Sequence, residues 1–340
     1  MEFKKILSDP LESVFAVSHL QHPDAEFLLV ASEGKEGACF AYDVGNQFSK
    51  QLVWEGSGGT KSIVQVPNSL DFIATQGFYP EYDGAHCQLV YGHYQDGSWE
   101  IRPLMHFPYL HRFDLVQAED GKTIYFIGAT IANSKLFPED WLDRGKLHVG
   151  YFDQKSRSLR GLQELPVRLL KNHGYFSVKE EGYSLIASAD GVFKLEYPTK
   201  ENPDWNLEQI FHEETSDVVE VDWTGPDAKD KAIIQGFYGD RFRVLNAVFQ
   251  QEVYRFPSPT PFGHALWAGY LAQKASILFG YREGKAELIL LQMKEDGIES
   301  QVVEAGVGAS NVLGFSVEGD AYIFSANHGQ NQVVLYQILE

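Results

Sequence analysis

The chain has 340 residues, of which 14% are aromatic, and its excess of acidic over basic side chains gives a formal net charge of −19 at pH 7. This length allows either two ordinary domains or one large all-β unit. The acidic balance argues against nucleic acid as a partner, because phosphate binding needs a clustered positive field.

The N-terminal segment, residues 1–14, carries two lysines but no continuous apolar run, and no later segment is long enough to span a bilayer. We therefore expect a cytoplasmic protein without a membrane partner. Cys39 and Cys87 lie in strand-like surroundings in different parts of the chain, which favours two buried free thiols over a disulfide or a metal pair.

Short apolar runs, each opened by a polar or small pair, recur along the whole chain. Seven copies begin near residues 12, 61, 111, 173, 216, 264 and 310, with spacings of 49, 50, 62, 43, 48 and 46 residues. The first copy contains four strand-like segments, at 13–20, 26–33, 38–44 and 49–55. This period is typical of four-stranded blades, so the sequence predicts an all-β fold, a single seven-bladed β-propeller over residues 1–340.

The last copy has room for only three strands, whereas segment 2–7 precedes the first copy and has no blade of its own. We expect this N-terminal strand to complete the last blade and close the ring, which removes an open sheet edge. The alternative fold is a pair of β-sandwiches, for which the regular period would be a coincidence.

The spacing of 62 residues indicates an insertion at 129–145, between the second and third strands of the third blade. Inside it, Pro138, Glu139 and Asp140 are typical of the first turn of a helix. A loop of this length is either a functional cover or a tolerated surface excursion.

Alignment of the copies places a histidine just before the innermost strand in three blades. These histidines are His111, His173 and His264, and the other four positions hold Glu12, Lys61, Ser216 and Ser310. Because the innermost strands start around the mouth of the central channel, three imidazoles there predict a site for a divalent metal such as zinc or manganese. The alternative is that each histidine hydrogen-bonds a neighbouring blade and fills the channel.

The loops that join second to third strands are expected on the same face. The tetrapeptide QGFY recurs in two of them, at 76–79 and 235–238. The residues expected near the mouth are Tyr79, Tyr238, Arg241, Tyr281, Arg282, Asn327 and His328. Aromatic rings with hydroxyl groups, together with guanidinium groups, suit a small anionic or carbohydrate-like ligand. Alternatively, the Gly-Phe-Tyr triplet packs blade against blade.

A propeller with His111, His173 and His264 at its mouth, flanked by tyrosines and arginines, resembles metal-containing sugar lyases and dehydratases. This group includes the propeller domain of aldos-2-ulose dehydratase and the seven-bladed polysaccharide lyases. The resemblance implies a carbon–oxygen lyase or dehydratase that acts on a small sugar-derived carbonyl or carboxylate compound.

In that hypothesis the metal polarises a substrate oxygen and so acidifies the adjacent C–H. The candidates for proton transfer are Tyr79, Tyr238 and His328. The candidates for substrate binding are Lys61, Gln76, Arg112, Gln235, Arg241, Tyr281 and Arg282.

Two other functions stay open. One is a non-enzymatic propeller that binds a protein or a glycan. The other is a lactonase-like hydrolase with a calcium ion, which would use oxygen ligands such as Glu12, Asp217 and Asn311.

Overall fold

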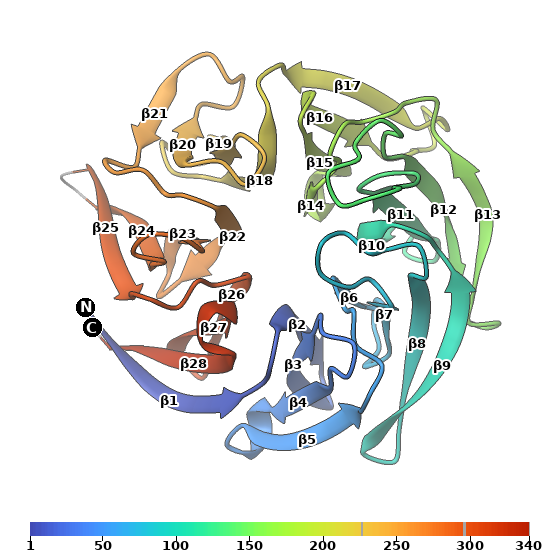
Figure 1. Cartoon of the computed structure of the whole chain (residues 1–340), viewed down its shortest axis with the longest axis horizontal. Helices are drawn as coiled ribbons and strands as arrows, with labels where there is room; N and C mark the ends of the chain where they lie inside the picture. Colours follow the sequence, from blue (N-terminus) through green and yellow to red (C-terminus); the bar gives the residue numbers. More distant parts are fainter. Residues whose placement is uncertain (226, 295–296, 340) are drawn as a thin grey trace. The chain divides into compact units, whose positions relative to one another are not determined.

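The structure is a computed structural model that describes residues 1–225, 227–294 and 297–339. These residues form strands that belong to seven four-stranded sheets, with no α-helix in the described ranges. Figure 1 labels the strands of each sheet. The fold is that of a seven-bladed β-propeller, as the repeat predicts.

The strands follow one another through the sheets in chain order. The first two sheets contain β2 (Val14–His22), β3 (Ala25–Ser32), β4 (Cys39–Asp43) and β5 (Ser49–Trp54), then β6 (Ile63–Gln65), β7 (Phe72–Gln76), β8 (Gln88–Gln95) and β9 (Ser98–His106). The next two contain β10 (Leu110–Gln117), β11 (Ile124–Thr130), β12 (Leu147–Asp153) and β13 (Ser158–Glu164), then β14 (Gly174–Val178), β15 (Tyr183–Ser188), β16 (Gly191–Glu196) and β17 (Asn206–Phe211).

The remaining three sheets are built in the same way. They contain β18 (Thr215–Val221), β19 (Asp230–Gln235), β20 (Arg241–Leu245) and β21 (Glu252–Arg255), then β22 (Gly263–Leu271), β23 (Lys274–Tyr281), β24 (Leu288–Lys294) and β25 (Gly297–Glu304), and finally β26 (Asn311–Val317), β27 (Asp320–Asn327) and β28 (Gln332–Leu339) with β1 (Glu2–Pro10). Short 3₁₀ helices are η1 (Val44–Asn46), η2 (Lys179–Glu181) and η3 (His328–Gln330).

The repeat register and the role of the N-terminal strand are confirmed. The first strand of every repeat begins within two residues of its predicted start. Strand β1 pairs antiparallel with β28, with Glu2 opposite Leu339 and Pro10 opposite Gln332. The N-terminal segment therefore supplies the fourth strand of the last sheet, and β28 is not left as an open edge.

The chain divides into two compact units. One comprises residues 1–17, 187–193 and 209–340, and the other comprises residues 18–186 and 194–208. In the first unit, Leu278, Leu290, Ile323 and Val334 belong to one buried apolar cluster. That the whole chain is a single domain stays a prediction.

Burial within a blade follows the order of its strands. All seven residues of β11, a second strand, are buried, whereas β13, the fourth strand of the same sheet, has no buried residue. A strand covered on both faces is a continuous apolar run, and an outer strand tolerates polar side chains. The outer strand β13 accordingly carries Arg160, Gln163 and Glu164.

Two hairpins show how local sequence sets the strand connections. Asp96 and Gly97 join β8 to β9, and Glu318 and Gly319 join β26 to β27, and all four residues have positive φ. Two-residue turns of this kind match the twist of paired strands, and glycine reaches positive φ without a steric cost.

The insertion lies between β11 and β12, as predicted, but the prediction of a helical turn at its centre was wrong. Asp140 N donates to Phe137 O at 3.0 Å, which closes a single reverse turn. The carboxylate of Asp140 accepts hydrogen bonds from the backbone N–H groups of Leu136 and Leu142, both at 3.1 Å. These bonds hold the backbone in a turn that does not continue as a helix. Figure 1 shows the loop, coloured green, as an irregular excursion.

Two further expectations concern the cysteines and the membrane. Cys39 and Cys87 are buried free thiols, as predicted. Within the described ranges, no helix has the length and apolarity needed to cross a bilayer.

Candidate functional site

Two of the three aligned histidines form a pair in the second unit. His111 and His173 are 2% and 0% exposed, and their ring centroids lie 4.6 Å apart. Nδ1 of His111 donates to the backbone oxygen of His173 at 3.3 Å. Phe78, from the first QGFY segment, packs edge-on against His111 with centroids 5.7 Å apart. This phenylalanine therefore packs blade against blade, as the alternative to a ligand-binding role predicted.

The third histidine, His264, lies in the first unit and is 2% exposed. Its Nδ1 donates to the backbone oxygen of Ser310, the residue at the equivalent position in the next blade, at 2.7 Å. The ring of Tyr238 is parallel to it at a centroid distance of 5.3 Å, and Tyr238 also stacks on Phe262 at 4.5 Å. Tyr238 is thus part of a stack of aromatic rings.

These hydrogen bonds place a proton on Nδ1 of His111 and of His264, because a carbonyl oxygen can only accept. Metal-ligating histidines commonly have the same arrangement, so it is compatible with either role. Across the described ranges, no group of three or more His, Cys, Asp or Glu side chains is placed to hold a metal ion. The three-histidine metal site stays a prediction.

Lys61 and Arg112, both predicted to bind substrate, make contacts within the fold. The Lys61 ammonium pairs with Glu33, and both side chains are 6% exposed. The same ammonium lies 5.3 Å from the ring centroid of Phe78. Arg112 donates from Nη1 to the backbone oxygen of Lys61 at 3.0 Å. Gln76 is buried at the end of β7.

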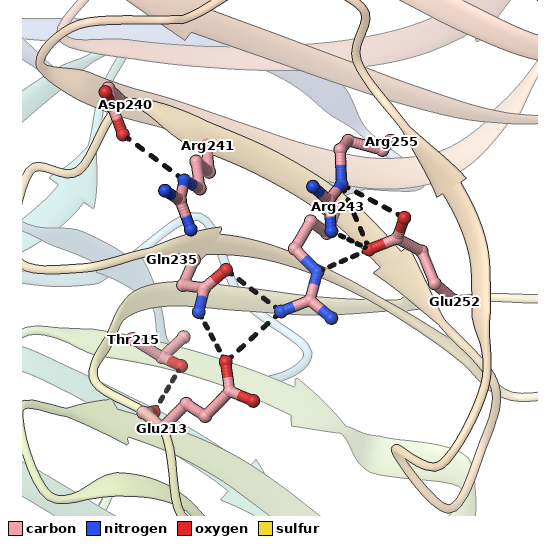
Figure 2. A network of polar contacts seen from close by, with 8 residues as sticks. All are labelled: Glu213, Thr215, Gln235, Asp240, Arg241, Arg243, Glu252 and Arg255. Carbon is pink, nitrogen blue, oxygen red and sulfur yellow. Dashed lines mark hydrogen bonds and ion pairs between the residues drawn. The ribbon is translucent and has the colours of Figure 1, made fainter.

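Gln235 belongs to a polar network in the first unit (Figure 2). Its amide donates to the carboxylate of Glu213, and its carbonyl oxygen accepts from Nη1 of Arg243 at 2.9 Å. Arg241 lies opposite Gln235 in the pairing of β19 with β20. Its side chain is 64% exposed, and its Nε lies 3.9 Å from a carboxylate oxygen of Asp240. The structure therefore brings these two predicted substrate-binding residues side by side, with their side chains in different polar contacts.

Tyr281, Arg282 and His328 have partners within the first unit. Tyr281 donates to Oε2 of Glu287 at 2.5 Å, and burial together with this carboxylate raises the pKa of its phenol. Arg282 donates from Nη2 to Nδ1 of His328 at 2.7 Å, and its guanidinium lies 5.2 Å from the centroid of Phe262.

The insertion loop is held by hydrogen bonds within itself. Oδ2 of Asp143 accepts from the side chains of Asn133 and Ser134, both at 2.6 Å. The Lys135 ammonium donates to the backbone oxygen of Asp140 at 2.6 Å and lies 3.2 Å from the ring centroid of Trp141. A cation over an indole face at this distance is a favourable contact. The loop therefore has a defined conformation.

This braced loop exposes large apolar side chains. Leu136 is 91% exposed, Phe137 is 57% exposed and Leu142 is 94% exposed. We call these three residues the insertion-loop patch. Apolar side chains grouped on an ordered loop are typical of a surface that another molecule covers.

A pocket of about 450 Å³ adjoins the insertion-loop patch. It is lined by Tyr79, Tyr82, Tyr109, Leu136 and Phe137, together with charged and proline side chains. Tyr79 is the predicted site residue that lines it. The sequence interpretation missed the other four, although an adjacent Leu-Phe pair inside a long loop was an available signal.

Comparison with known proteins supports the fold. No protein-family model and no curated protein matches the sequence. The chain is similar to the crystal structure of the WD40 β-propeller domain of Doa1, with 12% identity and a TM-score of 0.63 over 99% of this chain and 98% of that one. It is also similar to the β-propeller domain of Cps50 (Swd1) from Myceliophteria thermophila, with 8% identity and a TM-score of 0.65 over 99% and 100% of the two chains.

These comparisons correct the expected partner. The similar structures are described as β-propeller domains of Doa1 and Swd1, one of them a WD40 propeller, and neither is a sugar-lyase propeller. The prediction of a small carbohydrate-like substrate was therefore wrong. That prediction assumed that tyrosine and arginine side chains converge on a ligand. Instead, Tyr238 stacks on Phe262, and Tyr281 donates a hydrogen bond to Glu287.

Proposed function

We propose that this protein is a non-enzymatic propeller that binds a protein partner through the insertion-loop patch and the pocket beside it. The observation that carries the proposal is the exposure of Leu136, Phe137 and Leu142 on an internally hydrogen-bonded loop. The likeness to two propeller domains establishes only the fold.

The exposed apolar side chains of the insertion-loop patch favour binding energetically. Full burial of one leucine or phenylalanine side chain contributes about 1.5–3 kcal/mol. The fold leaves Leu136 and Leu142 almost entirely in water, so a partner that covers them gains most of this free energy. Aromatic residues are enriched in protein interfaces, and Tyr82 and Trp141 form an edge-to-face pair with ring centroids 4.8 Å apart in the same region.

The rigidity of the loop adds to the argument. Ordering a flexible loop on binding costs free energy, and a loop already fixed in its bound conformation avoids this cost. The hydrogen bonds of Asp140 and Asp143 and the contact of Lys135 with Trp141 fix the loop without a partner. A partner can therefore cover the insertion-loop patch without a rearrangement of the loop.

Site-specific photo-cross-linking in cells of the source organism tests this proposal. A photoreactive phenylalanine analogue replaces Phe137, and in a second protein it replaces Leu52, a leucine that is 49% exposed on β5. We expect discrete covalent adducts with another protein from position 137 and none of the same mass from position 52.

A matched pair of variants controls for non-specific contact. Leu136→Ser combined with Leu142→Ser should abolish the adducts from position 137, whereas Leu52→Ser should leave them unchanged. Absence of any adduct from position 137, or equal adducts from both positions, would refute the proposed function.

A further inference from the structure

The ammonium of Lys135 lies against aromatic rings at the wall of the pocket. Lys135 lines the pocket, and its Nζ is 3.2 Å from the ring centroid of Trp141 and 5.1 Å from that of Tyr82. It donates to the backbone oxygen of Asp140 at 2.6 Å. Both carboxylate oxygens of Asp140 accept instead from backbone N–H groups of the loop. In these contacts the ammonium therefore meets uncharged groups.

A second lysine lies over the same indole. Nζ of Lys171 is 5.9 Å from the ring centroid of Trp141. Burial, above all, and the Lys171 cation favour the uncharged amine of Lys135, whereas the charges of Asp140 and Glu139 favour its ammonium. The pKa of Lys135 falls to about 8 as a result. Desolvation and a neighbouring cation are the two features that make a lysine nucleophilic.

The pocket gives a small reagent access to this amine. Its volume of about 450 Å³ lies within the usual range for bound groups, roughly 300–1,000 Å³. The other charged residues that line it are exposed, and they are Lys35, Glu81 and Asp83. Water and salt screen exposed charges, so these three affect Lys135 less than its burial does.

We propose that Lys135 is a modification site that takes an acyl group from an acyl phosphate and then no longer braces the insertion loop. The nitrogen lone pair attacks the acyl carbon, and the bond from this carbon to the phosphate oxygen breaks. Phosphate leaves with one proton from the nitrogen, and the product is a neutral amide. The amide keeps one N–H for the backbone oxygen of Asp140, but the cation–π contact with Trp141 is lost together with the charge.

The modification site does not depend on the proposed function, but its effect on a protein partner does. The contact of Lys135 with Trp141 helps to fix the loop that carries the insertion-loop patch. A loop that has to be ordered on binding lowers the affinity. Acylation of Lys135 therefore weakens partner binding at the patch.

Treatment of the purified full chain with acetyl phosphate, followed at each lysine by mass spectrometry, tests the site. Lys285, whose side chain is 78% exposed, is the internal reference. At pH 7 the lowered pKa of Lys135 leaves roughly two-hundredfold more free amine than a lysine with the reference value has. A less basic group is also a weaker nucleophile, so the expected gain in rate over Lys285 is about tenfold.

The pH profile separates this reactivity from simple exposure. We expect the acylation rate of Lys135 to follow a titration with a midpoint near pH 8, whereas the rate of Lys285 keeps rising. Acylation of Lys135 no faster than that of Lys285 at pH 7, or a rate that still rises steeply above pH 9, would overturn the modification site.

Two variants test the effect on the loop. Lys135→Gln imitates the neutral acylated side chain, and Lys135→Arg keeps the charge. Hydrogen exchange of residues 133–143 should be about tenfold faster in Lys135→Gln than in Lys135→Arg, because only the arginine preserves a cation–π contact. Equal exchange in the two variants would show that the charge does not brace the loop and would overturn the inference.

Cross-linking from position 137 separates the inference from the proposed function. Adduct yield should fall in Lys135→Gln and persist in Lys135→Arg. If adducts form from position 137 but Lys135 is not selectively acylated, the proposed function stands and the inference falls. If Lys135 is selectively acylated but position 137 gives no adduct, the modification site stands and the proposed function falls.

Discussion

The buried pair of Lys61 and Glu33 allows a quantitative test of what these side chains do. Each is only 6% exposed, so removal of one leaves the other charge buried without its counter-ion. Breaking a buried ion pair from one side costs about 3–5 kcal/mol, whereas replacing both partners by neutral groups of similar size is often nearly neutral. We expect Lys61→Met and Glu33→Gln each to lower the free energy of unfolding by about 3–5 kcal/mol, and the double variant to lose less than either.

Unfolding by urea at neutral pH, followed by tryptophan fluorescence and circular dichroism, measures these differences. The thermal midpoint provides a second readout. For cooperative unfolding of the whole chain, an unfolding entropy of about 2.1 cal/mol/K per residue turns a loss of about 4 kcal/mol into a fall of roughly 6 °C. Leu52→Ser is the matched control, because this side chain is half exposed and surface substitutions usually change stability by less than about 0.5 kcal/mol.

The double-mutant cycle contains the result that would refute this reasoning. If the loss in the double variant equals the sum of the two single losses within about 0.5 kcal/mol, the two groups do not interact. Lys61 would then be available as a ligand-binding residue, as the sequence interpretation first assigned it. A strong coupling instead identifies it as a structural cation.

Three other predictions concern titration, thiol reactivity and metal content. Burial lowers the pKa of Lys135 to about 8, so between this pH and the unfolded value of 10.5 the unfolded chain holds more of this proton than the folded chain. The unfolding free energy of the wild type relative to Lys135→Met should therefore rise with pH across that window. A difference that does not change with pH in urea unfolding would contradict this. Burial raises the pKa of the Cys87 thiol to about 12 and that of Cys39 well above its usual value, so neither should react with Ellman's reagent at pH 8 until the chain is unfolded; rapid reaction of the folded protein would disprove it. Elemental analysis of protein purified without chelators decides the three-histidine hypothesis, because about one equivalent of zinc or manganese per chain would support it and a metal-free protein would end it.

The sequence predicts the fold well because the blade is a repeated unit. A period near 48 residues, interrupted once, places all seven first strands. The last repeat has room for only three strands, and this missing fourth strand places β1 beside β28. The turn at Asp140 could not be predicted in the same way. Pro-Glu-Asp is compatible with a helix start, and the outcome depends on which backbone groups the Asp140 carboxylate reaches.

The candidate site is harder to predict because its contacts are long-range. Alignment shows that His111 and His264 occupy equivalent positions, but their acceptors, the backbone oxygens of His173 and Ser310, lie 62 and 46 residues away. The pocket combines Tyr79, Tyr109 and Phe137 from separate loops. Residue type and spacing give no distance between such loops, so the sequence indicates the insertion as a candidate cover but not the surface that it completes.

The pairing of β1 with β28 determines how this sheet responds to mechanical force. Glu2 lies opposite Leu339, so a force that pulls these two residues apart acts on one end of an antiparallel pair. The hydrogen bonds of such a pair lie perpendicular to the strands, and they would break one after another, each worth about 1 kcal/mol net. Strand β1 would therefore unzip from the sheet at low force, whereas pulling Pro10 against Leu339 would load the same bonds together in shear.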